Sequence, residues 1–119
     1  MVEAYRESLP DSYLLVLRDM TESGPEVSLA RALHLAAHSG KPAVWVDCSL
    51  LERPSAEAVE LLLSYHEALR QAGIVLPLAH VEEHVRQQLL PSDGTDAKLP
   101  IVPTLLDAAA RPYLFKNAA

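Results

Sequence analysis

Apolar and polar positions along this chain switch between the period of strands and the period of helices, as an α/β domain requires. The residues 2–8 and the apolar run 13–17, separated by turn residues at 10–12, predict an antiparallel hairpin. Ala43-Val44-Trp45-Val46 is apolar on both faces, which is typical of a strand inside a sheet. Further strands are expected at 74–78 and 101–102.

Helical spacing fills the segments between these strands. Gly24-Pro25 predicts the start of a first helix, and Ser39-Gly40 predicts its end. Shorter helices are expected at 81–90 and, from the capping pair Thr104 and Asp107, at 105–110.

The longest predicted helix follows a loop at 48–54. Ser55 is its expected N-cap, it runs to about Gln71, and Gly73 stops it. One face carries a core-facing apolar stripe, and its flank carries a second apolar strip. The stripe consists of Val59, Leu62, Leu63, His66 and Leu69, and the strip consists of Leu61, Tyr65 and Ala68.

Composition limits the kind of protein. The chain has 119 residues, which predicts a single domain over 1–119. Half of its residues are apolar, which excludes disorder as the main state. A net charge of −6 argues against nucleic acid or an anionic membrane as the main partner. No apolar stretch is long enough for direct membrane insertion. The lone Cys48 and an N-terminus too charged for a signal peptide predict a cytoplasmic protein.

Few residues suggest catalysis. His80-Val-Glu-Glu-His84 matches the H-x-x-E-H pattern of inverted zinc proteases, but we interpret it as a solvated helix start, because little chain remains for a third ligand. His34 and His38 share a polar face with Arg31, whose charge would repel a metal ion, and are expected to be surface residues. Glycine-rich phosphate loops and nucleophile elbows are missing. From these residues we expect no catalytic residue, no metal and no cofactor.

The start of the long helix is the most informative place in the sequence. A helix N-terminus has free N–H groups and the positive end of the dipole, which stabilise a phosphate or a carboxylate. Glu57, in the first turn, is expected to steady the helix. Asp47 ends a strand as a receiver-domain phosphoacceptor does, but the acidic pair and the lysine of such a domain are not in the matching places. His66 is expected to be a core residue.

Four segments in order resemble one known family. They are Val-Trp-Val-Asp-Cys-Ser at 44–49, Pro-Ser-Ala-Glu-Ala-Val-Glu-Leu-Leu-Leu at 54–63, Ala-Gly-Ile-Val-Leu-Pro-Leu-Ala-His-Val at 72–81 and Leu-Pro-Ile-Val-Pro-Thr-Leu-Leu-Asp-Ala-Ala at 99–109. The chain resembles the STAS domain, named for sulphate transporters and anti-sigma factor antagonists, over about residues 13–110, with 111–119 as a C-terminal tail. The resemblance implies an α/β fold, with a four- to five-stranded mixed sheet and about four helices packed mainly on one face.

The resemblance also implies a binding role rather than catalysis. In that family, phosphorylation of a serine at the start of the long helix ends docking on a serine-kinase anti-sigma factor. Carried across by position, the motif's aspartate falls on Ser55, its first serine on Ala56, its phosphoacceptor serine on Glu57 and its glycine on Ala58. Glutamate cannot accept phosphate. Either Glu57 holds the domain in a permanently modified-like state, or the domain has left the kinase circuit and kept the scaffold.

The resemblance implies a protein partner, an anti-sigma factor or a serine-kinase-like protein, in bacterial partner-switching regulation. Two alternatives stay open: a module that binds a small ligand or nucleotide at this helix start, and a non-switching subunit of a transport or signalling assembly. The apolar residues at 113–115 predict that the tail packs on the domain or against a second copy in a homodimer. The expected partner contacts lie in the loop, at the helix start and on its flanking strip: Ser49, Glu52, Arg53, Leu61 and Tyr65.

Overall fold

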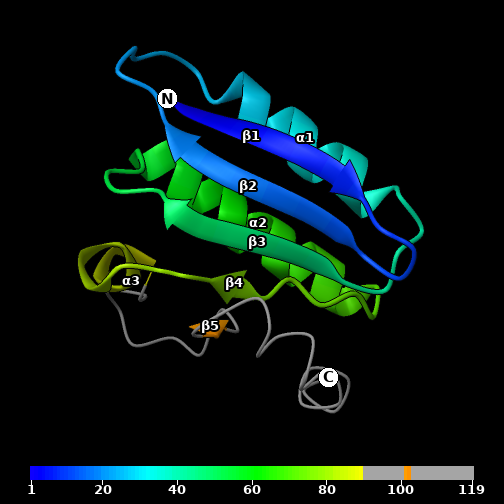
Figure 1. Cartoon of the computed structure of the whole chain (residues 1–119). Coiled ribbons are helices and arrows are strands. Elements are labelled where there is room, and N and C mark those ends of the chain that lie inside the picture. The colour runs from blue at the N-terminus through cyan, green and yellow to red at the C-terminus, as the bar shows by residue number, and fades with distance from the viewer. Residues whose placement is uncertain (90–100, 103–119) are drawn as a thin grey trace.

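The structure is a computed structural model that describes residues 1–89 and 101–102. In these residues five strands form one sheet in the order β1-β2-β3-β4-β5, accompanied by three helices (Figure 1). The strands are β1 (Val2–Ser8), β2 (Tyr13–Asp19), β3 (Val44–Leu50), β4 (Leu78–Ala79) and β5 (Ile101–Val102), and the helices are α1 (Val27–Ala37), α2 (Ala56–Gln71) and α3 (Glu83–Leu89).

The sheet is mixed, as predicted. β1 and β2 form the expected antiparallel hairpin, in register from Val2 opposite Asp19 to Ser8 opposite Tyr13. The other neighbouring strands are parallel, and α1 and α2 supply the crossovers that parallel neighbours require. The carboxyl ends of β2 and β3 therefore lie at one edge of the sheet, beside the starts of α1 and α2 (Figure 1).

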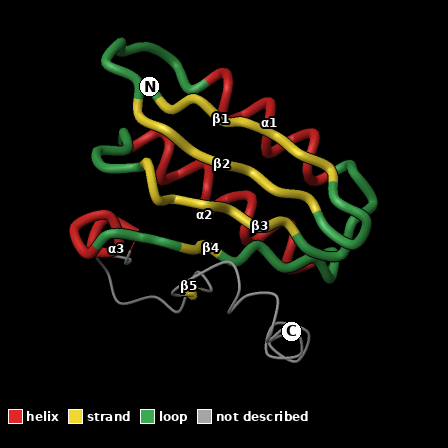
Figure 2. The backbone as a smooth tube through the Cα atoms, in the orientation of Figure 1, coloured by secondary structure: helices red, strands yellow, loops and turns green. Residues whose placement is uncertain are grey.

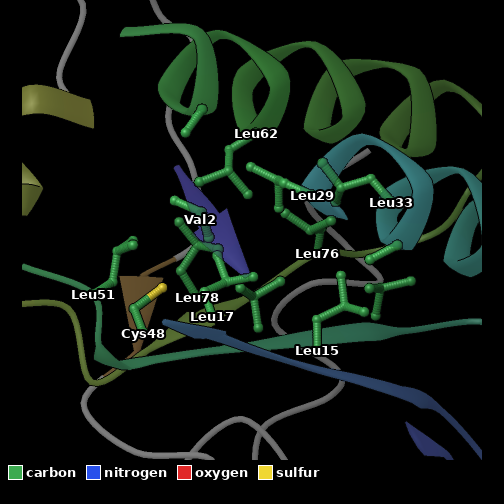
Figure 3. Packing of buried hydrophobic residues seen from close by; sticks show 14 of the residues in the cluster. Val2, Leu15, Leu17, Leu29, Leu33, Cys48, Leu51, Leu62, Leu76 and Leu78 are labelled. Carbon is green, nitrogen blue, oxygen red and sulfur yellow. The ribbon is translucent and has the colours of Figure 1, made fainter. Parts of the chain in front are cut away.

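α1 and α2 lie against the same face of the sheet, which confirms the predicted packing on one face (Figure 2). Side chains of the sheet and of both helices fill the layer between them (Figure 3). Leu15 and Leu17 of β2 point to this layer because strand residues two apart share a face. Leu29 and Leu33 of α1 and Leu62 of α2 meet them, because helix residues four apart share a stripe.

The main differences from the predicted boundaries concern α1, β3 and β4. α1 begins at Val27 instead of Pro25, because Glu26, with ψ 57°, is its non-helical N-cap residue. β3 continues along β2 as far as Leu50, so that Cys48, expected in a loop, is buried in the core. The strand expected at 74–78 pairs only in part. Pro77 has no N–H to donate to the ladder, and regular pairing is limited to the two residues of β4.

The stripe on α2 is partly confirmed. Leu62 and Leu69 are buried, together with Ala58, whereas the other predicted members, Val59, Leu63 and His66, are half-buried. None of the described helices is both long and apolar enough to cross a membrane. The helix expected at 105–110 and the tail 111–119 lie outside the described residues.

The first prediction compares two leucines on α1. Leu33 is fully buried and Leu35 is 38% exposed. Leu33→Ala should lower the free energy of unfolding by about 2–5 kcal/mol, because it leaves a cavity in the layer between helix and sheet. Leu35→Ala is the matched control and should have a much smaller effect. Urea denaturation of both variants measures the difference, and equal losses would contradict this description of the core.

Candidate functional site

The edge where β2 and β3 end gathers most of the residues that the sequence singles out. We call it the carboxyl edge: the ends of β2 and β3, the loop 51–55, and the first turns of α1 and α2 (Figure 1). It includes the whole motif 55–58 and all the loop residues predicted to contact a partner.

A buried carboxylate joins the parts of this edge. Glu26 is 2% exposed, and its side chain is surrounded by donors. Its Oε2 accepts the backbone N–H of Val2 at 2.7 Å, and its Oε1 accepts the hydroxyl of Ser55 at 3.0 Å. The amino group of Met1 lies 3.7 Å from Oε1. The carboxylate thus ties the first strand to the start of α2.

Glu57, in the first turn of α2, forms a second link between the starts of α2 and α1. Its Oε2 accepts the backbone N–H of Glu26 at 2.9 Å, so it satisfies a free donor at the start of the neighbouring helix. Ser55 is the N-cap of α2, as predicted, and its Oγ accepts the N–H of Ala58 at 3.1 Å. The starts of the two helices therefore support each other through two acidic side chains and one hydroxyl.

The four positions of the motif differ in exposure. Ser55 is half-buried, Ala56 and Glu57 are exposed, and Ala58 is buried. Glu57 is thus an exposed residue with one carboxylate oxygen engaged inside the domain. That engagement spans 31 residues of sequence, and no spacing rule could have predicted it.

An irregularity in β3 presents the residues that follow. Val16 of β2 pairs with Asp47, but Arg18 pairs with Leu50, so β3 has one residue more than β2 between these pairs. The Oδ1 of Asp47 accepts the N–H of Ser49 at 2.9 Å and stabilises this bulge. Ser49 and Leu50 are turned to the surface, and Leu50 is 53% exposed.

The loop after β3 is held through its backbone. Asp19, at the end of β2, accepts the N–H groups of both Glu52 and Arg53, the latter at 2.7 Å. The Nε2 of His84 contacts the carbonyl oxygen of Glu52. Because these contacts use main-chain atoms, the side chains of Glu52 and Arg53 stay exposed.

The flanking strip of α2 is less available. Leu61 and Tyr65 are half-buried and pack against the core, whereas Ala68 is exposed. Their predicted contact with a partner stays a prediction. Leu50 is the apolar residue that the sequence analysis missed, because it stands within a segment expected to be a loop. Leu50 faces outward because of the bulge in β3, which the hydrophobic pattern does not indicate.

The other candidate residues take structural or surface positions. His84, from the H-x-x-E-H pattern, contacts the loop and lies with its Nδ1 3.4 Å from Glu82, while His80 is exposed. Burial lowers the pKa of the half-buried His66. Within residues 1–89 and 101–102, no three histidine, cysteine or acidic side chains are grouped to hold a metal ion. Burial also raises the pKa of Cys48 to about 12, so its thiol is not a nucleophile at neutral pH.

Solved structures share this architecture. A serine-to-glutamate variant of RsbS from Moorella thermoacetica aligns with a TM-score of 0.69 over 96% of this chain and 95% of its own, at 13% identity. An anti-sigma factor antagonist from Mycobacterium paratuberculosis aligns with a TM-score of 0.75 over 92% of each chain, at 18% identity. The fold is STAS-like.

The NMR structure of the protein TM1081 is also similar, with a TM-score of 0.63, 15% identity, and coverage of 89% of this chain and 85% of that one. No family model and no curated protein matches the sequence. At these identities the likeness concerns the fold. It confirms the predicted fold class of the STAS-like domain, in which the long helix starts at the carboxyl edge.

The second prediction concerns Glu26. Glu26→Ala should lower the free energy of unfolding by at least about 1–3 kcal/mol, because the N–H of Val2 and the hydroxyl of Ser55 lose their acceptor in a buried place. Glu22→Ala is the control, since its side chain is exposed and only its backbone oxygen contacts Met1. Thermal unfolding of both variants measures the effect. An equally small shift for both would show that the carboxylate does not organise this edge.

The third prediction concerns Cys48. Iodoacetamide at about pH 8 should leave the folded protein unmodified, because the thiol is buried and its pKa is about 12. The same reagent should alkylate Cys48 fully once urea unfolds the chain. Mass spectrometry measures the extent of alkylation. Rapid alkylation of the native protein would contradict the burial of Cys48 in the core.

Proposed function

We propose that this STAS-like domain is a non-enzymatic interaction module that docks on an anti-sigma factor or a serine-kinase-like protein without a phosphorylation switch of its own. The docking surface consists of Ser49, Leu50, Glu52 and Arg53. The proposal is supported by the fold, which it shares with an anti-sigma factor antagonist and with RsbS.

The observation that carries the proposal is an exposed leucine on a fixed support. Leu50 is 53% exposed at the end of β3, where a bulge braced by Asp47 turns it outward. Asp19 fixes the next two residues through their amides. An exposed apolar side chain at the end of a strand, next to a loop with the charged residues Glu52 and Arg53, is a favourable anchor, because little conformational entropy is lost when a partner covers it.

Because of Glu57, phosphorylation at this position cannot switch the docking on or off. A carboxylate has no group that a kinase could phosphorylate, and it supplies a charge of −1 where a phosphate supplies about −1.5 to −2. Its Oε2 is also engaged with the N–H of Glu26. This engagement favours the second of the two hypotheses above, that the domain has left the kinase circuit and kept the scaffold.

The ligand-binding alternative has less support. A phosphate at the start of α2 would lie beside the carboxylate of Glu57, which repels it, and the N–H of Ala58 is already bonded to Ser55. The alternative of a non-switching subunit in a transport or signalling assembly uses the same docking surface. Identifying the protein that binds to this surface distinguishes that alternative from docking on an anti-sigma factor or a serine-kinase-like protein.

The fourth prediction tests the docking surface with two exposed leucines. Wild type, Leu50→Asp and Leu35→Asp are immobilised and exposed to an extract of the parent cell, and the bound proteins are identified by mass spectrometry. We expect one protein to bind wild type and Leu35→Asp and to be lost with Leu50→Asp, since a charge at an anchor position costs several kcal/mol of binding. Equal capture by all three would refute the docking surface.

Glu57→Ser, in the same assay, separates the two hypotheses for this residue. If Glu57 imitates a modified state, the serine variant should gain a partner that wild type does not bind. If the domain has left the circuit, the serine variant should bind the same partner as wild type, with lower stability because the start of α1 loses an acceptor.

A further inference from the structure

Two histidines that the proposed function does not use lie together at the end of α1. His34 lies in the last turn of α1 and His38 is its C-cap residue, and both are exposed. Figure 1 shows this end of α1 near the turn between β1 and β2, opposite the carboxyl edge. Their ring centroids are 4.3 Å apart and the rings are tilted by 40°. The sequence predicts surface residues on one polar face of the helix, and the structure confirms their exposure and brings the two imidazoles into contact.

A hydrogen bond fixes the chemical state of one ring. The Nδ1 of His38 lies 2.8 Å from the carbonyl oxygen of His34. A carbonyl oxygen only accepts, so Nδ1 is the protonated nitrogen, and Nε2 of the neutral ring carries a free lone pair. Histidines that bind metals are oriented in this way, with the second ring nitrogen donating to a carbonyl or carboxylate.

We propose that His34 and His38 chelate a divalent transition-metal ion such as Zn²⁺, with water in the remaining positions. Two nitrogens at about 2.0–2.1 Å from a tetrahedral Zn²⁺ are about 3.4 Å apart. The ring centroids are 4.3 Å apart, so a nitrogen of each ring can reach the same ion once the side chains turn toward it. Imidazole suits Zn²⁺, Ni²⁺ and Cu²⁺ better than it suits Mg²⁺ or Ca²⁺.

The charges around the pair act in both directions. The carbonyl end of α1 and the net charge of −6 favour a cation. Arg31, one turn before His34 on the exposed side of the same helix, opposes it. Lys41, beyond the end of α1, is directed to the hairpin, where its Nζ donates to the carbonyl of Pro10 at 3.2 Å. The site is therefore weakened mainly by Arg31, and removal of that charge should strengthen it.

The fifth prediction is a calorimetric titration of the untagged full chain with ZnCl₂ at neutral pH. Wild type should bind one ion at this pair. His34→Ala and His38→Ala should each weaken that binding by more than about tenfold. Removing a residue that only hydrogen-bonds to a metal ligand already weakens metal binding by about tenfold or more, and removing a ligand should cost more than that. Arg31→Gln should tighten it. His84→Gln removes another exposed histidine and should leave it unchanged.

The controls keep the result interpretable. His34, His38 and Arg31 are exposed, so the variants should unfold at nearly the same temperature as wild type without metal. Chelation requires both rings. Absence of Zn²⁺ binding to wild type, loss of binding in only one of the two alanine variants, or equal loss in His84→Gln would each overturn the proposal.

Discussion

The arrangement of the carboxyl edge depends on one buried carboxylate. A carboxylate that is removed from water must be surrounded by donors, and Glu26 finds them on segments far apart in the sequence. Val2 lies 24 residues away and Ser55 lies 29 residues away. The backbone of the same residue donates to Glu57, 31 residues away. The first strand and the starts of both long helices can therefore satisfy Glu26 only in one mutual position.

This constraint gives Glu57 a structural role that is independent of the role implied by the resemblance. A serine side chain is shorter by two heavy atoms, and the N–H of Glu26 would have to find another acceptor. Glutamate thus adds a bond between two helices at the place where the resemblance puts a switch. A switch needs two states of similar free energy, whereas a bond that joins both helices stabilises one of them.

Local patterns in the sequence were enough to predict the hairpin and the limits of α2, whereas the packing of the helices on one face was implied by the resemblance to a known family. Ser55 as the N-cap and Gly73 just beyond the end of the helix are signals of this kind. The start of α1 was predicted wrongly, because Pro25 suits a first helical turn, whereas contacts of Glu26 with distant residues set the boundary. The exposure of Leu50 depends on how β3 pairs with β2, and no window along the chain contains that information.

The conformation of the exposed loop is held by hydrogen bonds to its backbone and does not depend on its exposed side chains. Asp47 bonds to the backbone of Ser49, and Asp19 bonds to the backbone of Glu52 and Arg53. None of these bonds uses an exposed side chain of the loop. Substitutions of Glu52 or Arg53 can therefore change the chemistry of the exposed surface without changing the path of the chain. An ordered loop also loses little entropy on binding, so specificity can be altered while affinity is kept.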